Sequence, residues 1–261
     1  MIAAWSSGLA EDHMDESILV DLGPRIASHP WWIARAELTL TLLERLGIKP
    51  PASVLDAGCG WGVTLSALER SGFRATGLDV SRAALERIDA PERSLVEADL
   101  TRPWPEGSPT FDAVLALDVI EHLDDDAGAV ARLAERLRPG GRLVVSVPAL
   151  PELFSEFDAI QGHRRRYLPE TLRGAFATSG LEVEQVFWWG GWLVERLRRG
   201  RLRPRSRPGD SAAQTYRRYL TLPPWPASVV IAAMFARERD RALDGALTIG
   251  TSLFAVARKQ S

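Results

Sequence analysis

The feature that most constrains the fold is a set of alternate glycines directly behind a short apolar segment. The segment reads VLDAGCGWG over residues 54–62, with Gly58, Gly60 and Gly62 following Asp56. A glycine-rich turn between a strand and a helix lets a ligand lie against bare backbone, whose free N–H groups attract an anionic group. The pattern therefore predicts an α/β fold that binds a nucleotide-like ligand at the end of its first strand.

Short apolar runs alternate with helical segments behind this turn. Strands are expected at residues 53–58, 74–80, 93–100, 111–120 and 142–148, and helices at residues 63–72, 81–88 and 127–141. Continuously apolar strands separated by helices are typical of a parallel sheet that is covered on both faces. Two more strands are expected at residues 181–189 and 250–259. The sequence thus predicts a doubly wound α/β fold with a mostly parallel, seven-stranded sheet.

Segments on both sides of this core carry other patterns. Apolar residues recur at helical spacing over residues 31–46, so residues 1–47 are expected to form an N-terminal helical cap. The opening 25 residues show no steady period and are expected to be an arm or a loose first helix. Residues 48–261 are expected to form the main domain, with residues 191–245 as a helical, basic insertion before the last strand.

Composition excludes several classes of protein. With 261 residues, 46% of them hydrophobic, the chain can bury one large core. A net charge of -2 gives no global basic field for nucleic acid, and the single cysteine excludes an internal disulfide framework. The N-terminus does not resemble a secretory signal, and the best apolar run, residues 227–236, is half of the about 20 residues that a bilayer span needs. A cytoplasmic location is expected.

Two classes of ligand compete for the glycine turn. The dinucleotide fingerprint G-x-G-x-x-G has a third glycine that permits close packing of helix on strand. Counted from Gly58 through Gly60, that position is Val63. The dinucleotide fingerprint therefore fails at this position, where the spacing is G-x-G-x-G. The two competing classes are a nicotinamide-dependent oxidoreductase and an enzyme that binds the nucleoside–amino acid donor S-adenosylmethionine.

Five segments in order resemble the successive motifs of the class I S-adenosylmethionine-dependent methyltransferases. They read VLDAGCGWG, GLDVS, EADL, FDAVLALDVIEHL and RPGGRLVVSVP, over about residues 50–150. HPWWIARAEL and FDAIQGHRRRYLPETL further resemble a bacterial subgroup whose members often accompany glycan or secondary-metabolite pathways. The resemblance implies an enzyme that uses S-adenosyl-L-methionine. A noncatalytic protein that retains the donor fold is a second alternative.

The resemblance also gives the matched residues roles in binding the donor. Asp79 would accept both ribose hydroxyls, with a helix N-cap at this position as the alternative. Asp99 would accept the adenine amino group, with the capping of a turn as the alternative. Cys59 is expected only to pack. The expected donor-binding residues are Asp56, Gly58, Gly60, Gly62, Asp79, Val80, Asp99, Leu100, Leu117 and Asp118.

Candidates for catalysis lie behind the fourth strand, in DVIEHLDDD. A hydroxyl acceptor must lose its proton at or before attack on the methyl group, whereas a neutral amine needs less help. His122 is the first candidate for the base and His163 the second, with packing of the loop as the alternative. Some class I methyltransferases hold a divalent cation with acid-x-x-Glu-His at this place, but their first acid is usually Glu. No metal is expected, and the alternative is a cluster of Asp118, Glu121, His122 and His163.

Two segments are expected to contact the acceptor. One supplies Trp31 and Trp32, and the other, GHRRRY, supplies Arg164, Arg165, Arg166 and Tyr167. Consecutive guanidinium groups could clamp a carboxylate or a phosphate. The alternative is a structural loop in which these arginines pair with Glu156, Asp158 or Glu170. The expected reaction is methyl transfer to a hydroxyl, less readily to an amine, of an acidic small molecule or glycan intermediate.

The insertion leaves two possibilities for its surroundings. Seven arginines lie between Arg196 and Arg207, followed by ASVVIAAMFA over residues 227–236. Such a segment could rest on an anionic membrane surface as a peripheral contact. A solvated linker beside a buried or dimer-forming helix is the alternative. The sequence does not fix the oligomeric state.

Overall fold

The computed structural model describes residues 2–6, 18, 22–200, 205–221 and 227–260. Its strands are β1 (Ala3–Ala4), β2 (Ser53–Ala57), β3 (Arg74–Asp79), β4 (Ser94–Glu97), β5 (Phe111–Leu117), β6 (Leu137–Pro148), β7 (Leu181–Trp189) and β8 (Ser252–Lys259). They form one sheet in the order β1-β4-β3-β2-β5-β6-β8-β7. The strands from β1 to β6 pair in parallel, whereas β8 pairs antiparallel with both β6 and β7. The predicted fold class is confirmed, although the described sheet has eight strands where seven were expected.

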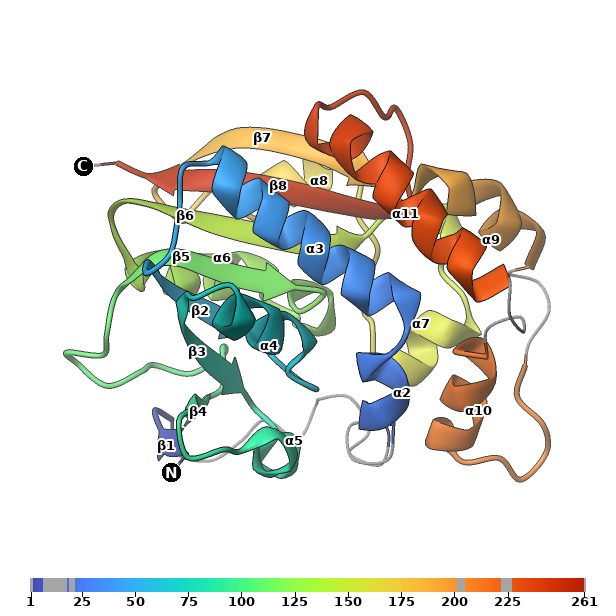
Figure 1. Cartoon of the computed structure of the whole chain (residues 1–261), viewed down its shortest axis with the longest axis horizontal. Helices are drawn as coiled ribbons and strands as arrows, with labels where there is room; N and C mark the ends of the chain where they lie inside the picture. Colours follow the sequence, from blue (N-terminus) through green and yellow to red (C-terminus); the bar gives the residue numbers. More distant parts are fainter. Residues whose placement is uncertain (1, 7–17, 19–21, 201–204, 222–226, 261) are drawn as a thin grey trace.

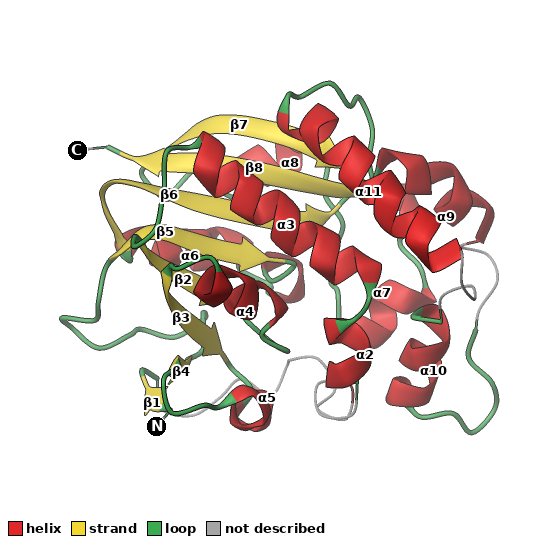
Figure 2. Cartoon of the chain, in the orientation of Figure 1, coloured by secondary structure: helices red, strands yellow, loops and turns green. Residues whose placement is uncertain are grey.

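The helices cover both faces of this sheet (Figures 1 and 2). They are α2 (Gly23–Ala27), α3 (Pro30–Arg45), α4 (Val63–Arg70), α5 (Arg82–Ile88), α6 (Asp126–Glu135), α7 (Glu156–Gln161), α8 (Pro169–Gly174), α9 (Val194–Gly200), α10 (Ala212–Tyr219) and α11 (Ala227–Leu243). Buried side chains of α3, α4 and α11 pack on one face of the sheet, and those of α6 and α8 pack on the other. This two-sided covering explains why the central strands are apolar along their whole length.

The element β1 was not predicted. Ala3 and Ala4 pair with Val96 and Glu97 of β4, and the backbone N–H of Trp5 donates to the carbonyl of Glu97. Two alanines are too few to show the alternation of a strand. This short strand is defined by its pairing with β4, which the sequence does not reveal. The rest of the expected N-terminal arm, residues 7–17 and 19–21, lies outside the described residues.

Helix α3 is built as its sequence predicts. Pro30 occupies its first turn, and the side chain of His29 accepts a hydrogen bond from the backbone N–H of Trp31 at 3.2 Å. Leu38 and Leu42, one turn apart, are buried against the sheet. The helix stops before Gly47. The φ of this residue is +76°, in the left-handed region that glycine adopts without strain. Residues 30–45 thus join the main core instead of standing apart from it.

Parallel strands bring their carboxyl ends to one edge of the sheet. Asp56 lies near the end of β2, Asp79 ends β3, Asp99 follows β4, and Asp118 follows β5. The chain runs outward from β2 to β3 on one side and returns on the other side with β5. Ligands of open α/β sheets bind at such a reversal. Figure 1 shows α2, α7, α9 and α10 beyond this edge.

The insertion contains α9, α10 and α11. None of the helices in the described residues is both long and apolar enough to cross a bilayer. Arg201, Arg203 and Trp225, which belong to the predicted basic and tryptophan-rich stretch, lie outside the described residues.

Candidate active site

A cavity of about 570 Å³ lies at the carboxyl edge of the sheet. The glycine turn and the ends of β3, β4 and β5 form one wall, and α3, α7, α9, α10 and α11 contribute the opposite wall. The predicted site residues that line it are Trp31, Trp32, Asp56, Gly58, Gly60, Asp79, Val80, Asp99, Leu100, Leu117, Asp118, His122, His163 and Arg166. Five predicted residues do not line it: Gly62, Glu121, Arg164, Arg165 and Tyr167.

The glycine turn is tied to the neighbouring strand. The backbone N–H groups of Gly58 and Cys59 both donate to the carbonyl of Leu78, at 2.7 and 2.9 Å. Gly58 has a φ of +75°, and a Cβ atom there would collide with the side chain of Val119. Gly60 has a φ of +45° and would meet no protein atom within 4 Å, so its missing side chain leaves open space in the cavity. Cys59 is buried, and burial raises the pKa of its thiol.

Asp79 joins the turn to the next strand. Its Oδ2 accepts a hydrogen bond from the backbone N–H of Gly60 at 2.8 Å, and its Oδ1 accepts one from the N–H of Ser81 at 2.9 Å. Ser81, and not Asp79, caps α5, because its hydroxyl accepts from the N–H of Ala84. A carboxylate has about four lone-pair positions, so these two bonds are compatible with a further donor such as a hydroxyl.

Asp99 caps a turn. Its Oδ1 accepts from the backbone N–H and from the hydroxyl of Thr101, both at 2.7 Å, and its Oδ2 lies 3.3 Å from Nε of Arg102. The predicted alternative is therefore present, although Asp99 and Leu100 also line the cavity. The two roles are compatible for a carboxylate at the edge of the sheet.

Arg35 of α3 contacts the end of β5. Its Nη1 donates to Oδ2 of Asp118 in an ion pair and to the carbonyl of Leu117 at 3.3 Å. Asp118 has a φ of +58°, which is rare for a residue with a side chain, and Ser146 donates to its Oδ1 at 3.0 Å. The Nε of Arg35 is buried without a partner in the described chain. This arginine also lines the cavity and was not predicted, although it lies one helical turn beyond Trp31.

Asp56 is buried below the turn. Its Oδ2 has no hydrogen-bond partner among the described residues. Burial, together with the nearby Asp79, raises the pKa of Asp56 to about 7 against the attraction of Arg35. A buried carboxyl without a full set of partners is a group that a bound ligand or water can satisfy.

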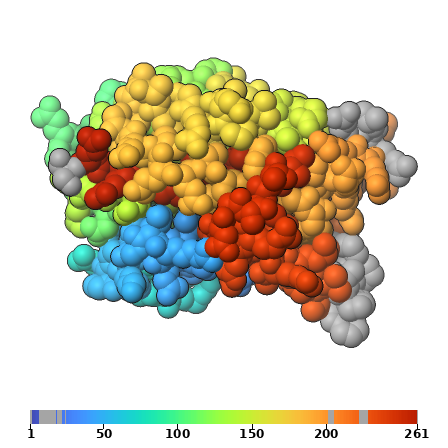
Figure 3. Space-filling view, turned by 90° about the horizontal axis from the view of Figure 1, so that it is seen from above, coloured from blue at the N-terminus to red at the C-terminus, as the bar shows by residue number. Residues whose placement is uncertain are grey.

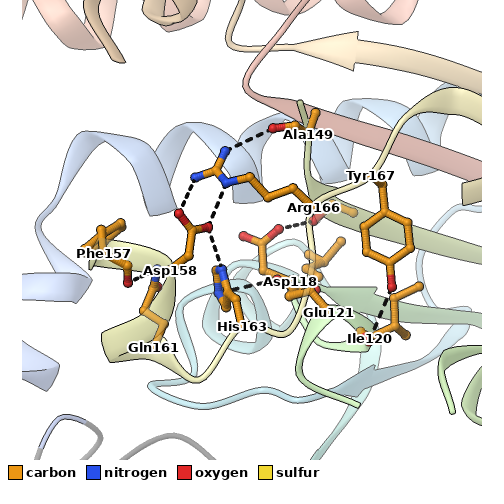
Figure 4. A network of polar contacts seen from close by, with 12 residues as sticks. Asp118, Ile120, Glu121, Ala149, Phe157, Asp158, Gln161, His163, Arg166 and Tyr167 are labelled. Atoms are coloured by element: carbon orange, nitrogen blue, oxygen red, sulfur yellow. Dashed lines mark hydrogen bonds and ion pairs between the residues drawn. The ribbon is translucent and has the colours of Figure 1, made fainter. Parts of the chain in front are cut away.

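Arg166, Asp158 and His163 form a continuous chain of contacts (Figure 4). The Nε and Nη2 atoms of Arg166 lie 2.7 and 3.1 Å from the carboxylate oxygens of Asp158, and Nδ1 of His163 lies 3.0 Å from Oδ1 of the same residue. Burial alone would raise the pKa of Asp158, but its bonds to His163 and Arg166 lower it. The ionised carboxylate therefore holds the Nδ1 proton of His163, so that Nε2 carries the lone pair.

Glu121 and His122 lie beside this chain. The Nε2 of His163 is 3.8 Å from Oε1 of Glu121, and the rings of His122 and His163 meet edge to face at 4.8 Å. Glu121 is fully buried, and among the described residues neither of its carboxylate oxygens has a hydrogen-bond partner. Burial, aided by Asp118, raises the pKa of Glu121 well above its usual range. Burial lowers the pKa of His122 to about 4, so this histidine is neutral at pH 7.

The predicted metal cluster is brought together in part. Possible ligand atoms of Glu121, His122 and His163 lie within 4.8 Å of one another. Asp118 is not in this group, because Arg35 and Ser146 hold its carboxylate. Three of the four predicted residues therefore converge.

The arginine segment is divided between two roles. Arg164 donates to the carbonyl of His122 at 2.8 Å and pairs with Asp124, and Arg165 pairs with Asp126 at 3.3 Å. The buried Tyr167 donates its hydroxyl proton to Asp126 at 2.7 Å. These contacts hold the loop to the segment after β5. The structural role is the predicted alternative, but the acidic partners of Arg164 and Arg165 are Asp124 and Asp126 and not Glu156 or Glu170. Arg166 does line the cavity, and it takes the predicted partner Asp158.

Several aromatic side chains line the cavity. Trp31 packs on Trp189 with ring centroids 4.5 Å apart, and Trp32 meets Trp61 at 6.0 Å. Phe157 of α7 lies 5.1 and 4.9 Å from the rings of two tyrosines of α10. The lining residues that were not predicted include Trp61, Phe157, Trp192, Tyr216, Tyr219 and Phe235. For Trp192, Tyr216, Tyr219 and Phe235 the signal in the sequence was the aromatic content of the insertion, and Trp61 lies within the glycine turn itself.

The comparisons with known proteins agree with this geometry. The model of a family described as methyltransferase domain matches residues 31–186. The chain is 31% identical over 164 residues to an O-methyltransferase of Pyrenophora dematioidea, covering 59% of this chain and 61% of that one. It is 33% identical over 102 residues to a ubiquinone biosynthesis O-methyltransferase of Alkalilimnicola ehrlichii, covering 36% of this chain and 40% of that one. The chain thus spans about half the length of these curated relatives.

Two solved structures share the fold over nearly the whole chain. The [4+2]-cyclase SpnF superposes with a TM-score of 0.61 at 19% identity, covering 98% of this chain and 99% of that one. A putative methyltransferase in complex with the Haloferax volcanii Trm112 activator gives a TM-score of 0.61 at 19% identity, covering 97% and 100%. At this level of identity the likeness shows the fold alone.

Proposed function

The chain belongs to the class I S-adenosylmethionine-dependent methyltransferases, and on this premise we propose that it transfers the donor's methyl group to a hydroxyl group of a small molecule. The fold by itself would not support a reaction, because one protein with this fold is described as a cyclase. The observation that carries the proposal is one cavity that is lined both by the glycine turn with Asp79 and by His163, whose Nδ1 lies 3.0 Å from Oδ1 of Asp158 behind the wall.

The site fits the donor. The space at Gly60 is one that a Cβ would fill, and Asp79 lines the same cavity. Among the described residues Oδ2 of Asp56 is buried without a hydrogen-bond partner. We propose that Asp79 accepts the ribose hydroxyls and that Asp99 and Leu100 hold the adenine. Arg35 supplies a cation for the carboxylate of the methionine part. The bound sulfonium supplies an activated methyl group for in-line displacement.

We propose that His163 takes the proton from the acceptor hydroxyl. Asp158 fixes its Nδ1, so Nε2 is the atom that can accept a proton inside the cavity. The imidazolium that forms would be stabilised by the ionised Asp158. His122 is the weaker candidate, because burial has lowered its pKa to about 4 and with it the affinity of this ring for a proton. The O-methyltransferase names of two relatives support oxygen as the methylated atom.

The acceptor wall supports an acidic acceptor with a flat or apolar body. Trp31, Trp32 and the aromatic residues of α7 and α10 offer faces for such a body. Arg196 and Arg205 line the same cavity and can bind a carboxylate or a phosphate. An acidic glycan intermediate and an acidic aromatic compound both satisfy these requirements.

Calorimetry and methyl transfer test the proposal together. The purified protein should bind S-adenosyl-L-methionine and not NADH, and it should transfer a labelled methyl group to a compound in an extract of its source organism. Binding of NADH alone would favour the oxidoreductase. Donor binding without transfer to any extract fraction would favour a noncatalytic protein.

We propose that transfer does not require a metal, and chelation tests this point. The activity should survive treatment with EDTA. Loss of activity that a divalent cation restores would contradict this proposal and identify Glu121, His122 and His163 as the candidate ligands.

A further inference from the structure

The first half of α11 exposes an apolar face. Val229 and Val230 are each 55% exposed, and Met234 is 38% exposed. Ile231 and Phe235 lie on the other side of the same turns and line the cavity. The helix is therefore apolar all round at this end, which is typical of a helix that is covered on every side. The space-filling view shows α11, in red, at the molecular surface (Figure 3).

The second half of α11 has an ordinary solvated face. Arg237, Asp240 and Arg241 are exposed there, and Arg45 of α3 pairs with Asp240 at 3.2 Å. The outward face of one helix thus changes from charged to apolar over a few turns. Low polarity is confined to the end of the helix that borders the cavity.

Helix α9 extends the apolar face with basic residues. Leu197 is 38% exposed, and it lines the cavity together with the exposed Arg196. We call Val229, Val230, Met234 and Leu197 the apolar rim. Arg198 pairs with Glu195 and Glu152, but within the described part of the chain neither Arg196 nor Arg199 forms an ion pair. Figures 1 and 3 show α9 next to α11, so basic side chains stand beside the apolar rim.

We propose that the apolar rim and the arginines of α9 form a docking surface for an anionic lipid bilayer. Apolar side chains beside arginines match the boundary between acyl chains and negatively charged headgroups. A second copy of the chain fits less well, since a symmetric interface would bring the α9 arginines of two copies together. The docking surface orients the cavity rim toward the headgroups. It goes beyond the methyl-transfer proposal and does not depend on it.

Vesicle co-sedimentation of the full chain tests the proposal. One set of vesicles contains phosphatidylcholine alone, and the other adds phosphatidylglycerol. The wild type should pellet with the anionic vesicles only, and less as the salt concentration rises. The double variant V229S/V230S should bind these vesicles at least about tenfold more weakly. R199Q should weaken binding by about fivefold, as expected for one basic residue near the surface.

Controls separate docking from folding and from donor binding. Leu168 is also exposed, but it begins α8 on the opposite face of the sheet, so L168S should bind the anionic vesicles like the wild type. V229S/V230S should keep the wild-type melting temperature and affinity for S-adenosyl-L-methionine, because neither valine lines the cavity. Three results would overturn the proposal: wild type that stays in the supernatant, V229S/V230S that pellets like the wild type, or a lipid-free dimer that V229S/V230S abolishes.

Discussion

The Nδ1 atom of His163 lies 3.0 Å from Oδ1 of Asp158, and Arg166 holds the same carboxylate from its other side. The ring of His163 is thereby fixed by a residue of α7 that lies five positions earlier in the chain. The Nε2 atom points away from Asp158 and toward Glu121, at 3.8 Å. A base that is oriented in this way needs no rearrangement before it accepts a proton.

Replacing His163 should therefore slow methyl transfer and leave donor binding intact. H163A is expected to lower kcat by about 10²- to 10⁴-fold, the usual contribution of a positioned base. D158N should lower kcat less, because the ring remains but loses its orientation. Rates of label transfer to the extract acceptor and calorimetry with the donor measure the two effects. A full rate in H163A, with a large loss in H122A, would move the role to His122.

Asp79 is expected to carry much of the donor affinity. Loss of hydrogen bonds to a charged group costs about 1.5–3 kcal/mol each, so D79N should weaken binding of S-adenosyl-L-methionine by about 10- to 100-fold. Asp89, exposed at the end of α5 and outside the cavity, provides the control variant D89N. Calorimetry measures the affinity of both variants for S-adenosyl-L-methionine. Equal affinities of D79N and D89N would show that Asp79 does not bind the donor.

Alanine substitutions at three glycines with a positive φ distinguish three effects: backbone strain, collision with a neighbouring side chain, and loss of space for the ligand. G140A meets no neighbour and should cost about 1 kcal/mol from backbone strain alone. G58A adds a collision with Val119 and should lower the melting temperature clearly further. G60A should resemble G140A in stability but bind the donor more weakly, because its methyl group enters the cavity. Melting curves and calorimetry check these expectations. Unchanged donor affinity in G60A would contradict the proposal that the donor lies against the backbone of Gly60.

The stability of the protein should depend on pH through Asp56. Burial raises the pKa of this carboxyl to about 7 in the folded chain, against about 3.9 in an unfolded one. Its contribution is therefore complete below about pH 4 and is lost as the pH rises through 7. From pH 4 to 7 the free energy of unfolding of D56N should fall less steeply than that of the wild type, by up to about 1.4 kcal/mol per pH unit.

Asp112 provides a control of opposite sign for this pH experiment. Burial would raise its pKa, but hydrogen bonds from Ser53 and Arg138 lower it. Its contribution is therefore present above the unfolded pKa and is lost in acid. In denaturant titrations, the change of the free energy of unfolding with pH should differ between D112N and the wild type only below about pH 4.

If the free energies of unfolding of D56N and the wild type change with pH in parallel, Asp56 is ionised in the folded chain and the expectation is wrong.

Arg165 should matter little for either substrate. It pairs with Asp126 at 3.3 Å and donates to the carbonyl of Asp124 at 3.1 Å, and it does not line the cavity. R165A should therefore cost at most about 1 kcal/mol of stability and change neither Michaelis constant. R196A, which removes a lining residue, should raise the acceptor Michaelis constant. A selective rise of that constant in R165A would place Arg165 at the acceptor.

The sheet and the glycine turn could be predicted because their signals are local. Apolar runs and the alternate glycines specify strands and a tight turn within a few residues. Arg35 could not be assigned a role, since its contact with Asp118 spans 83 positions. The partners of Arg164 and Arg165 were missed for the same reason: Asp124 and Asp126 lie about 40 residues away, whereas the nearby Glu156 and Glu170 had been expected. Contacts across the fold decide such pairs.

The place of β8 between β6 and β7 has a consequence for synthesis on the ribosome. In the described sheet β7 pairs with β8 alone, so its backbone groups have no neighbouring strand until residues 252–259 have been translated. During that interval the aromatic end of β7, Phe187 to Trp189, would be open to wrong partners. A nascent chain stalled before residue 252 should therefore be a target for chaperones.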